Sequence, residues 1–162
     1  MAGKSYKQEV MKGKFSDFMD GAYSDLQELS SELDEWASNM EGGNLGNTDK
    51  CSRVREAADT LGNHTDAPGM VDGLDEEEVS VAVSVPRSQK NGTSRAVRLE
   101  NIVSTLDSLI SFADEQKDAL EESELVEKEE THDLIDEIEN LISQLETTKD
   151  EIEGVEIPGM YG

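Results

Sequence analysis

Sixty consecutive residues, from Ser94 to Glu153, contain neither glycine nor proline, although Gly92 and Gly154 lie close to the two ends. Both residue types destabilise the interior of a helix, so their absence over such a length favours long uninterrupted α-helix. Apolar residues recur every three or four positions through the stretch, and carboxylates occupy many of the others. The stretch therefore predicts helices with an apolar stripe and a strongly acidic exposed face.

Two heptad-like seams lie within this stretch. The first runs from Leu99 to Leu120 in steps of 3-4-3-4-3-4, and the second runs from Leu134 to Ile152 in steps of 4-3-4-3-4. A polar stretch at 121–133 separates the seams, which are slightly out of phase. We therefore favour an antiparallel helical hairpin over 94–153, with a single rod of about 90 Å as the alternative. The seam residues expected to form contacts are Leu106, Leu109, Ile138, Leu141 and Leu145.

The N-terminal part of the chain, residues 1–62, is expected to form a second helical hairpin. Apolar residues follow helical spacing from about Ser5 to Glu41, and the pair Gly42-Gly43 ends this long helix. Thr48 is a good N-cap for a short helix over 49–61. The aromatic residues on the long stripe are expected to serve core or interface packing, and they are Phe15, Phe18, Tyr23 and Trp36.

Residues 63–93 are expected to be a linker, because glycine, proline and acidic residues dominate its first half without periodicity. One strand-like run, at 79–85, interrupts it, with four valines alternating with small residues. A single strand must pair with something. The candidate partners are the segment 155–157, a symmetry-related copy and another protein, and the run could equally be an arm lying in a groove.

Four basic residues, Arg87, Lys90, Arg95 and Arg98, form the only basic cluster beyond the first 60 positions. We expect this cluster to neutralise neighbouring carboxylates. Contact with nucleic acid is the less favoured alternative, because no aromatic residues are interleaved with the charges. The remaining segment, 154–162, is expected to be a non-helical C-terminal tail, since it contains Pro158 and Gly159.

The overall fold class expected is mainly α: elongated helical hairpins with one short extended or β segment. Only 35% of the residues are hydrophobic and 4% aromatic, which suits helix pairs better than a thick core. The formal net charge of -24 argues against direct binding to nucleic acid or to an anionic membrane. A protein partner with a basic face is the natural expectation, and a homo-oligomer is possible.

Location inside a cell is favoured by the single cysteine, Cys51, which permits no internal disulfide. The N-terminal residues lack the apolar region of a secretory signal, and no run approaches the roughly 18 apolar residues of a membrane span. We therefore expect a cytoplasmic protein, or, for a viral protein, one in the host cytoplasm or the virion.

No pattern in the sequence predicts an enzyme. His64 and His132 have no cysteine or serine partner at a catalytic spacing, and no glycine-rich phosphate loop is present. The sequence therefore predicts no catalytic residue, no cofactor and no metal site.

Two functional hypotheses follow from the acidic helices. Residues 114–153 contain 17 acidic residues and three lysines. The first hypothesis is a structural or adaptor role, as in an accessory factor or virion component that assembles through its seams and docks on basic surfaces. The second is an inhibitor that mimics DNA and occupies the basic groove of a nucleic-acid-binding protein. The carboxylates expected to meet a partner are Glu121, Glu122, Glu127, Glu129 and Glu130.

Overall fold

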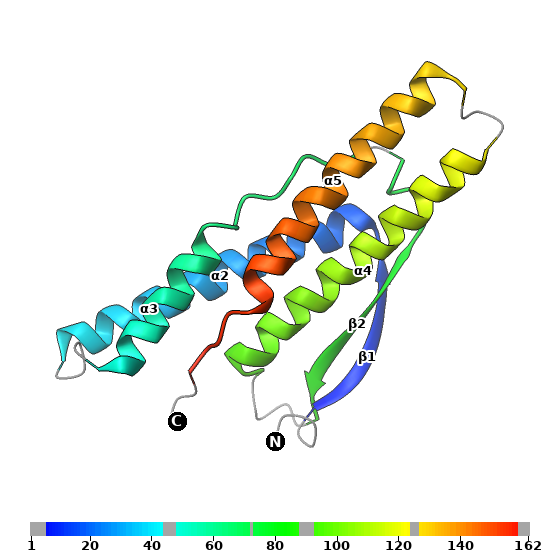
Figure 1. The fold of residues 1–162 in the computed structure, drawn as a ribbon. Coiled ribbons are helices and arrows are strands. Elements are labelled where there is room, and N and C mark those ends of the chain that lie inside the picture. The colour runs from blue at the N-terminus through cyan, green and yellow to red at the C-terminus, as the bar shows by residue number, and fades with distance from the viewer. Residues whose placement is uncertain (1–5, 44–47, 72, 88–92, 124–126, 159–162) are drawn as a thin grey trace.

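The computed structural model describes residues 6–43, 48–71, 73–87, 93–123 and 127–158 (Figure 1). In this part of the chain the fold is mainly α, with four helices in two hairpins and one two-stranded antiparallel sheet, so the predicted fold class is confirmed. The elements, in chain order, are β1 (Tyr6–Gly13), α2 (Phe15–Gly42), α3 (Asp49–Gly62), β2 (Val79–Pro86), α4 (Arg95–Glu122) and α5 (Glu129–Glu153).

Helices α4 and α5 lie side by side as an antiparallel hairpin, which confirms the favoured arrangement of 94–153 and shows that the single rod is wrong (Figure 1). Ser94 begins α4 as an N-cap, and its hydroxyl accepts a hydrogen bond from the amide of Val97 at 3.3 Å. The two seams face each other and are buried along most of their length. Residues 124–126, in the middle of the connection, lie outside the described residues.

Helices α2 and α3 form the other hairpin. Thr48 caps α3 as expected, because its hydroxyl accepts from the amide of Cys51 at 3.2 Å. The prediction of one helix from about Ser5 to Glu41 was partly wrong, since α2 begins only at Phe15 and the preceding residues form β1. The cause is a partner distant in sequence. The apolar spacing of residues 6–13 also fits a helix, but β2 pairs with all of these residues as an antiparallel strand.

The sheet joins two segments far apart in the chain. β1 pairs antiparallel with β2 over its whole length, from Tyr6 opposite Pro86 to Gly13 opposite Val79. The strand predicted at 79–85 is therefore confirmed, but its partner is β1, so the expected pairing with 155–157, with a symmetry-related copy or with another protein was wrong. β2 also packs on α4, with Val79 and Val81 buried.

A single hydrophobic core runs through the described residues. It contains side chains from all four helices and β2. Val71 and Leu74, in the segment that composition alone assigned to a linker, are also buried in it. Among the helices that the structure describes, none is long and apolar enough to cross a membrane.

Candidate functional site

The acidic surface of the α4–α5 hairpin is the principal candidate for a binding site. Every described Asp and Glu between positions 114 and 153 is exposed. The five carboxylates singled out from the sequence lie around the tip of the hairpin, where α4 ends and α5 begins, and they are Glu121, Glu122, Glu127, Glu129 and Glu130. In Figure 1 this tip extends past α2 and α3, so it is open to a partner.

Folding into a hairpin concentrates the charge. The 16 acidic residues and three lysines that the structure describes between 114 and 153 lie alongside one helix, α5, of 25 residues. At 1.5 Å per residue that helix is about 38 Å long, so the surface carries about one net negative charge per 3 Å. Duplex DNA carries one charge per about 1.7 Å. The hairpin thus approaches the charge density of DNA more closely than one extended helix would.

Two of the three lysines in this region are engaged with carboxylates of the hairpin itself. Lys149 on α5 lies 3.2 Å from Asp107 on α4 and 3.8 Å from Glu153. The hydrogen bond to Asp107 raises the pKa of Lys149, so the lysine stays charged. Lys117 similarly lies 3.7 Å from Glu139 across the hairpin. These ion pairs link the two helices, and the third lysine, Lys128, lies exposed at the tip among the glutamates.

The predicted seam residues are in the interior. Leu106, Leu109, Ile138, Leu141 and Leu145 are each at most 1% exposed. Their apolar surface is therefore used within the chain, and it is not presented to another molecule. Within the hairpin, it is the carboxylates that face solvent.

The four predicted aromatic residues occupy different environments. Phe15 is fully buried and its ring lies 6.0 Å from that of Phe112 on α4. Tyr23 is buried and bonds to Thr148 on α5. Phe18 is half-buried against the core. These residues hold α2 against its neighbours.

Trp36, the fourth, is half-buried and lies close to two cations. The Lys50 amine is 5.5 Å from the centre of its ring and the Arg95 guanidinium is 5.0 Å from it. Arg95 and Arg98 also pair with Glu32, at 3.6 Å and 2.6 Å. For these two arginines the expected neutralisation of neighbouring acid is confirmed, whereas Lys90 lies outside the described residues.

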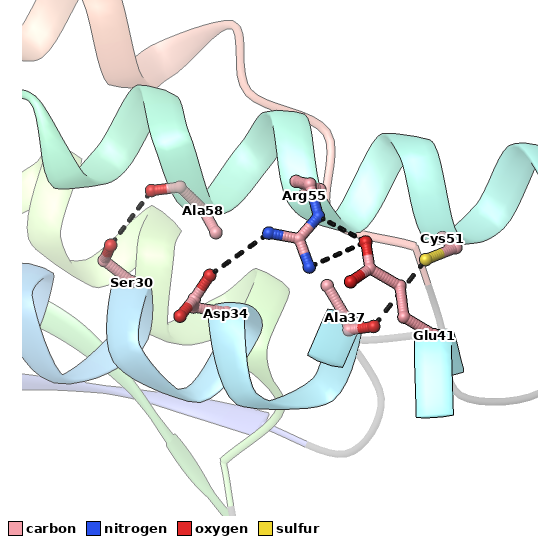
Figure 2. A network of polar contacts seen from close by, with 7 residues as sticks. All are labelled: Ser30, Asp34, Ala37, Glu41, Cys51, Arg55 and Ala58. Atoms are coloured by element: carbon pink, nitrogen blue, oxygen red, sulfur yellow. Dashed lines mark hydrogen bonds and ion pairs between the residues drawn. The ribbon is translucent and has the colours of Figure 1, made fainter. Parts of the chain in front are cut away.

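A polar network joins α2 to α3 on the face shown in Figure 2. Arg55 on α3 lies 2.8 Å from Glu41 and 3.6 Å from Asp34, both on α2. Close by, the Ser30 hydroxyl donates to the carbonyl oxygen of Ala58 at 2.9 Å. The contacts in this network satisfy one another across the helix pair, so its role is structural.

A groove of about 760 Å³ opens between α3, α4, the end of α5 and the following segment at 155–158. Leu99, Val103, Val155 and Ile157 give it an apolar lining, and several charged side chains of both signs line it too. Its volume is in the range of small-molecule sites. The described residues that line it include no histidine or cysteine.

Among the residues that the structure describes, no three His, Cys, Asp or Glu side chains are grouped so that they could hold a metal ion. No family model, curated protein or solved structure matches the chain. A function is therefore inferred from the geometry and charge of the acidic hairpin itself.

Proposed function

We propose that this protein is a non-enzymatic, acidic interaction protein whose α4–α5 hairpin docks on a basic surface of a partner protein. The observation that carries the proposal is the contrast between the hairpin's interior and its surface. The seams are buried, two of the three lysines are paired within the hairpin, and every described carboxylate from 114 to 153 is exposed.

The partner's chemistry follows from this surface. A lysine- or arginine-rich protein face would meet closely spaced carboxylates held on rigid helices, which favours rapid, salt-sensitive association. Arginine would add bidentate hydrogen bonds to individual carboxylates. A polyanionic partner would be repelled.

DNA mimicry is the second candidate, and the charge density of the hairpin favours it. A surface with about one charge per 3 Å could occupy a groove shaped for phosphates spaced at about 1.7 Å along a duplex. Mimicry predicts that duplex DNA competes with the protein for its partner. An adaptor that docks on a basic face unrelated to nucleic acid would be indifferent to DNA.

The experiment measures binding to a panel of purified basic proteins, including nucleic-acid-binding proteins, at low and physiological salt. A tip variant replaces five glutamates with glutamine, at positions 121, 122, 127, 129 and 130. A matched control changes five exposed carboxylates of α2 and α3 to amides, and they are Asp20, Glu28, Glu35, Glu56 and Asp59. Both variants change the net charge equally.

The proposal expects the tip variant to weaken binding about tenfold or more and the control to weaken it much less. Equal effects of the two variants would show that only total charge matters. Absence of salt-sensitive binding to any protein of the panel would contradict the proposal. Competition by duplex DNA separates mimicry from the adaptor role.

A further inference from the structure

The small sheet has one closed edge and one open edge. On the closed edge, the side chain of Asn101 on α4 acts like a neighbouring strand. Its oxygen accepts from the Ser84 amide at 2.8 Å, and its amide nitrogen donates to the Ser84 carbonyl at 2.9 Å. Ser104 adds a hydrogen bond from its hydroxyl to the Ala82 carbonyl at 2.9 Å. Helix α4 therefore covers the outer edge of β2 at Ala82 and Ser84.

The outer edge of β1 has no third strand beside it in the described part of the chain. At its first residue the Arg87 guanidinium donates to the Tyr6 carbonyl at 3.1 Å, and Gln8 and Val10 follow on the same edge. Val10 and Met11 on this strand are 66% and 49% exposed, and they are the large apolar residues that the described surface exposes most. A strand edge with exposed apolar side chains is a template for pairing with another strand.

The hydrogen-bonding pattern shows which groups are available. The outward polar groups of Ser84 are bound by Asn101, so Gln8 and Ser84 form a pair that exchanges no backbone hydrogen bonds. The amide and carbonyl of Gln8 consequently point to the open edge. Because the pattern repeats every second residue, those of Val10 point the same way.

We propose that two copies of this chain pair through the open edge of β1, antiparallel about a two-fold axis at Gln8, to form a four-stranded sheet. The symmetry places Gln8 opposite Gln8 of the second copy. It also places Lys7 of each copy opposite Glu9 of the other. Oppositely charged cross-strand pairs stabilise a sheet. Val10 would lie opposite Tyr6 of the second copy and lose part of its exposure.

Charge opposes self-association less at this face than elsewhere on the molecule. The chain carries a net charge of -24, which opposes contact between copies almost everywhere. Residues 6–14 are an exception, with three lysines and one glutamate. The antiparallel arrangement also directs the two acidic hairpin tips to opposite ends, because α4 runs alongside the sheet (Figure 1).

The interface is small. A strand pair of this length falls below the range of about 1,200–2,000 Å² that stable complexes bury, so the dimer should be weak and depend on concentration. Sedimentation equilibrium at physiological salt is expected to show the average mass rising from one copy towards two as the protein is concentrated.

Three sets of variants test the pairing. Val10→Pro removes an amide that points to the open edge without removing a β1–β2 hydrogen bond, so a folded monomer is expected. Gln8→Cys is expected to form a disulfide between copies, since opposed residues of a hydrogen-bonded pair are about 5.5 Å apart at Cα. The native Cys51 is buried and does not compete.

The charge pair supplies the sharpest control. Within one chain Lys7 already lies 3.5 Å from Glu9, so the control must separate this in-strand pair from the pairs between copies. Lys7→Glu and Glu9→Lys are each expected to weaken the dimer several-fold, and a mixture of the two variants is expected to restore it as a heterodimer, because only the pairs between copies then join opposite charges. A wild-type mass that stays at one copy at every concentration, or a mixture that stays as weak as the single variants, would overturn the proposal.

Discussion

The hydroxyl of Tyr23 lies 2.8 Å from the hydroxyl of Thr148, and this buried hydrogen bond joins α2 to α5 across 125 positions of the sequence. The Thr148 hydroxyl also donates to the carbonyl of Gln144 at 3.2 Å. The bond thus connects the first helical hairpin to the second at a point where few other polar groups are buried.

Removing this hydrogen bond should lower the free energy of unfolding. Thr148→Val is expected to cost about 1–3 kcal/mol, because it leaves the buried Tyr23 hydroxyl without this partner. Tyr23→Phe is expected to cost about 1 kcal/mol, because Thr148 keeps its bond to Gln144. The double variant is expected to cost less than the two together, since neither partner is then left alone. Urea denaturation of the four proteins measures this coupling, and strict additivity would show that the bond contributes nothing.

Alkaline pH should destabilise the fold through the same tyrosine. Burial raises the pKa of Tyr23, and the hydrogen bond to Thr148 offsets this only in part. The folded state therefore favours the protonated phenol. Its contribution to stability is complete below the ordinary tyrosine value of about 10 and is lost as the pH rises towards the raised value. Unfolding measured against pH should show this loss in the native protein and not in Tyr23→Phe.

The loss of stability at acidic pH should depend in part on Glu32. Its hydrogen bond with Arg98 lowers the pKa of the Glu32 carboxyl below 4.5. The resulting stabilisation is present above that value and is lost as the pH falls through the lowered one. Arg98→Gln should raise the pKa of Glu32, which a carboxyl-detected NMR titration can follow. Lys50→Gln, a change of the same charge nearby, should leave it almost unchanged.

Core and surface positions of the acidic hairpin should differ sharply in their effect on stability. Leu109→Ala and Leu141→Ala, both at buried seam positions, are each expected to cost about 2–5 kcal/mol. Glu129→Gln, on the exposed tip, is expected to change stability by no more than about 0.5 kcal/mol. Thermal and urea unfolding measure both. A small effect at Leu109 would show that the seam is loosely packed.

Added salt should stabilise the protein. The net charge of -24 is spread mainly over exposed carboxylates, whose mutual repulsion salt screens. The melting temperature is expected to rise between low and physiological ionic strength. The five-glutamine tip variant should show a smaller rise, because it has less repulsion to relieve, and an equal rise would place the repulsion elsewhere on the surface.

The helical seams were predictable because their signal is local. Residues such as Leu106 and Leu109 lie three or four positions apart, and burial of that stripe is a direct consequence of helix geometry. The turn between the helices was harder to predict, because it lacks glycine and proline. At its two ends, Ser123 and Lys128 adopt extended backbone angles, which any residue can adopt. The missing turn residues were therefore weak evidence for a rod.

β1 could not be predicted from its own residues. The apolar residues Tyr6, Val10 and Met11 fit the spacing of a helix, and only the ladder of β2 makes the strand preferable. The hydrogen bonds of Asn101 to the edge of β2 could not be predicted from the sequence either, because asparagine within a helix has many other roles. The burial of Val71 and Leu74 depends on the path of an aperiodic segment across the core.

The distance between the two strands of the sheet in sequence has a consequence for biosynthesis. Tyr6–Gly13 leaves the ribosome early, whereas its ladder partner Val79–Pro86 follows only after both helices of the first hairpin. Throughout that interval the β1 segment has no ladder partner, and its helical apolar spacing allows it to extend α2 for a time. Translation therefore orders assembly, with the first helical pair formed before the β1 segment reaches its final conformation.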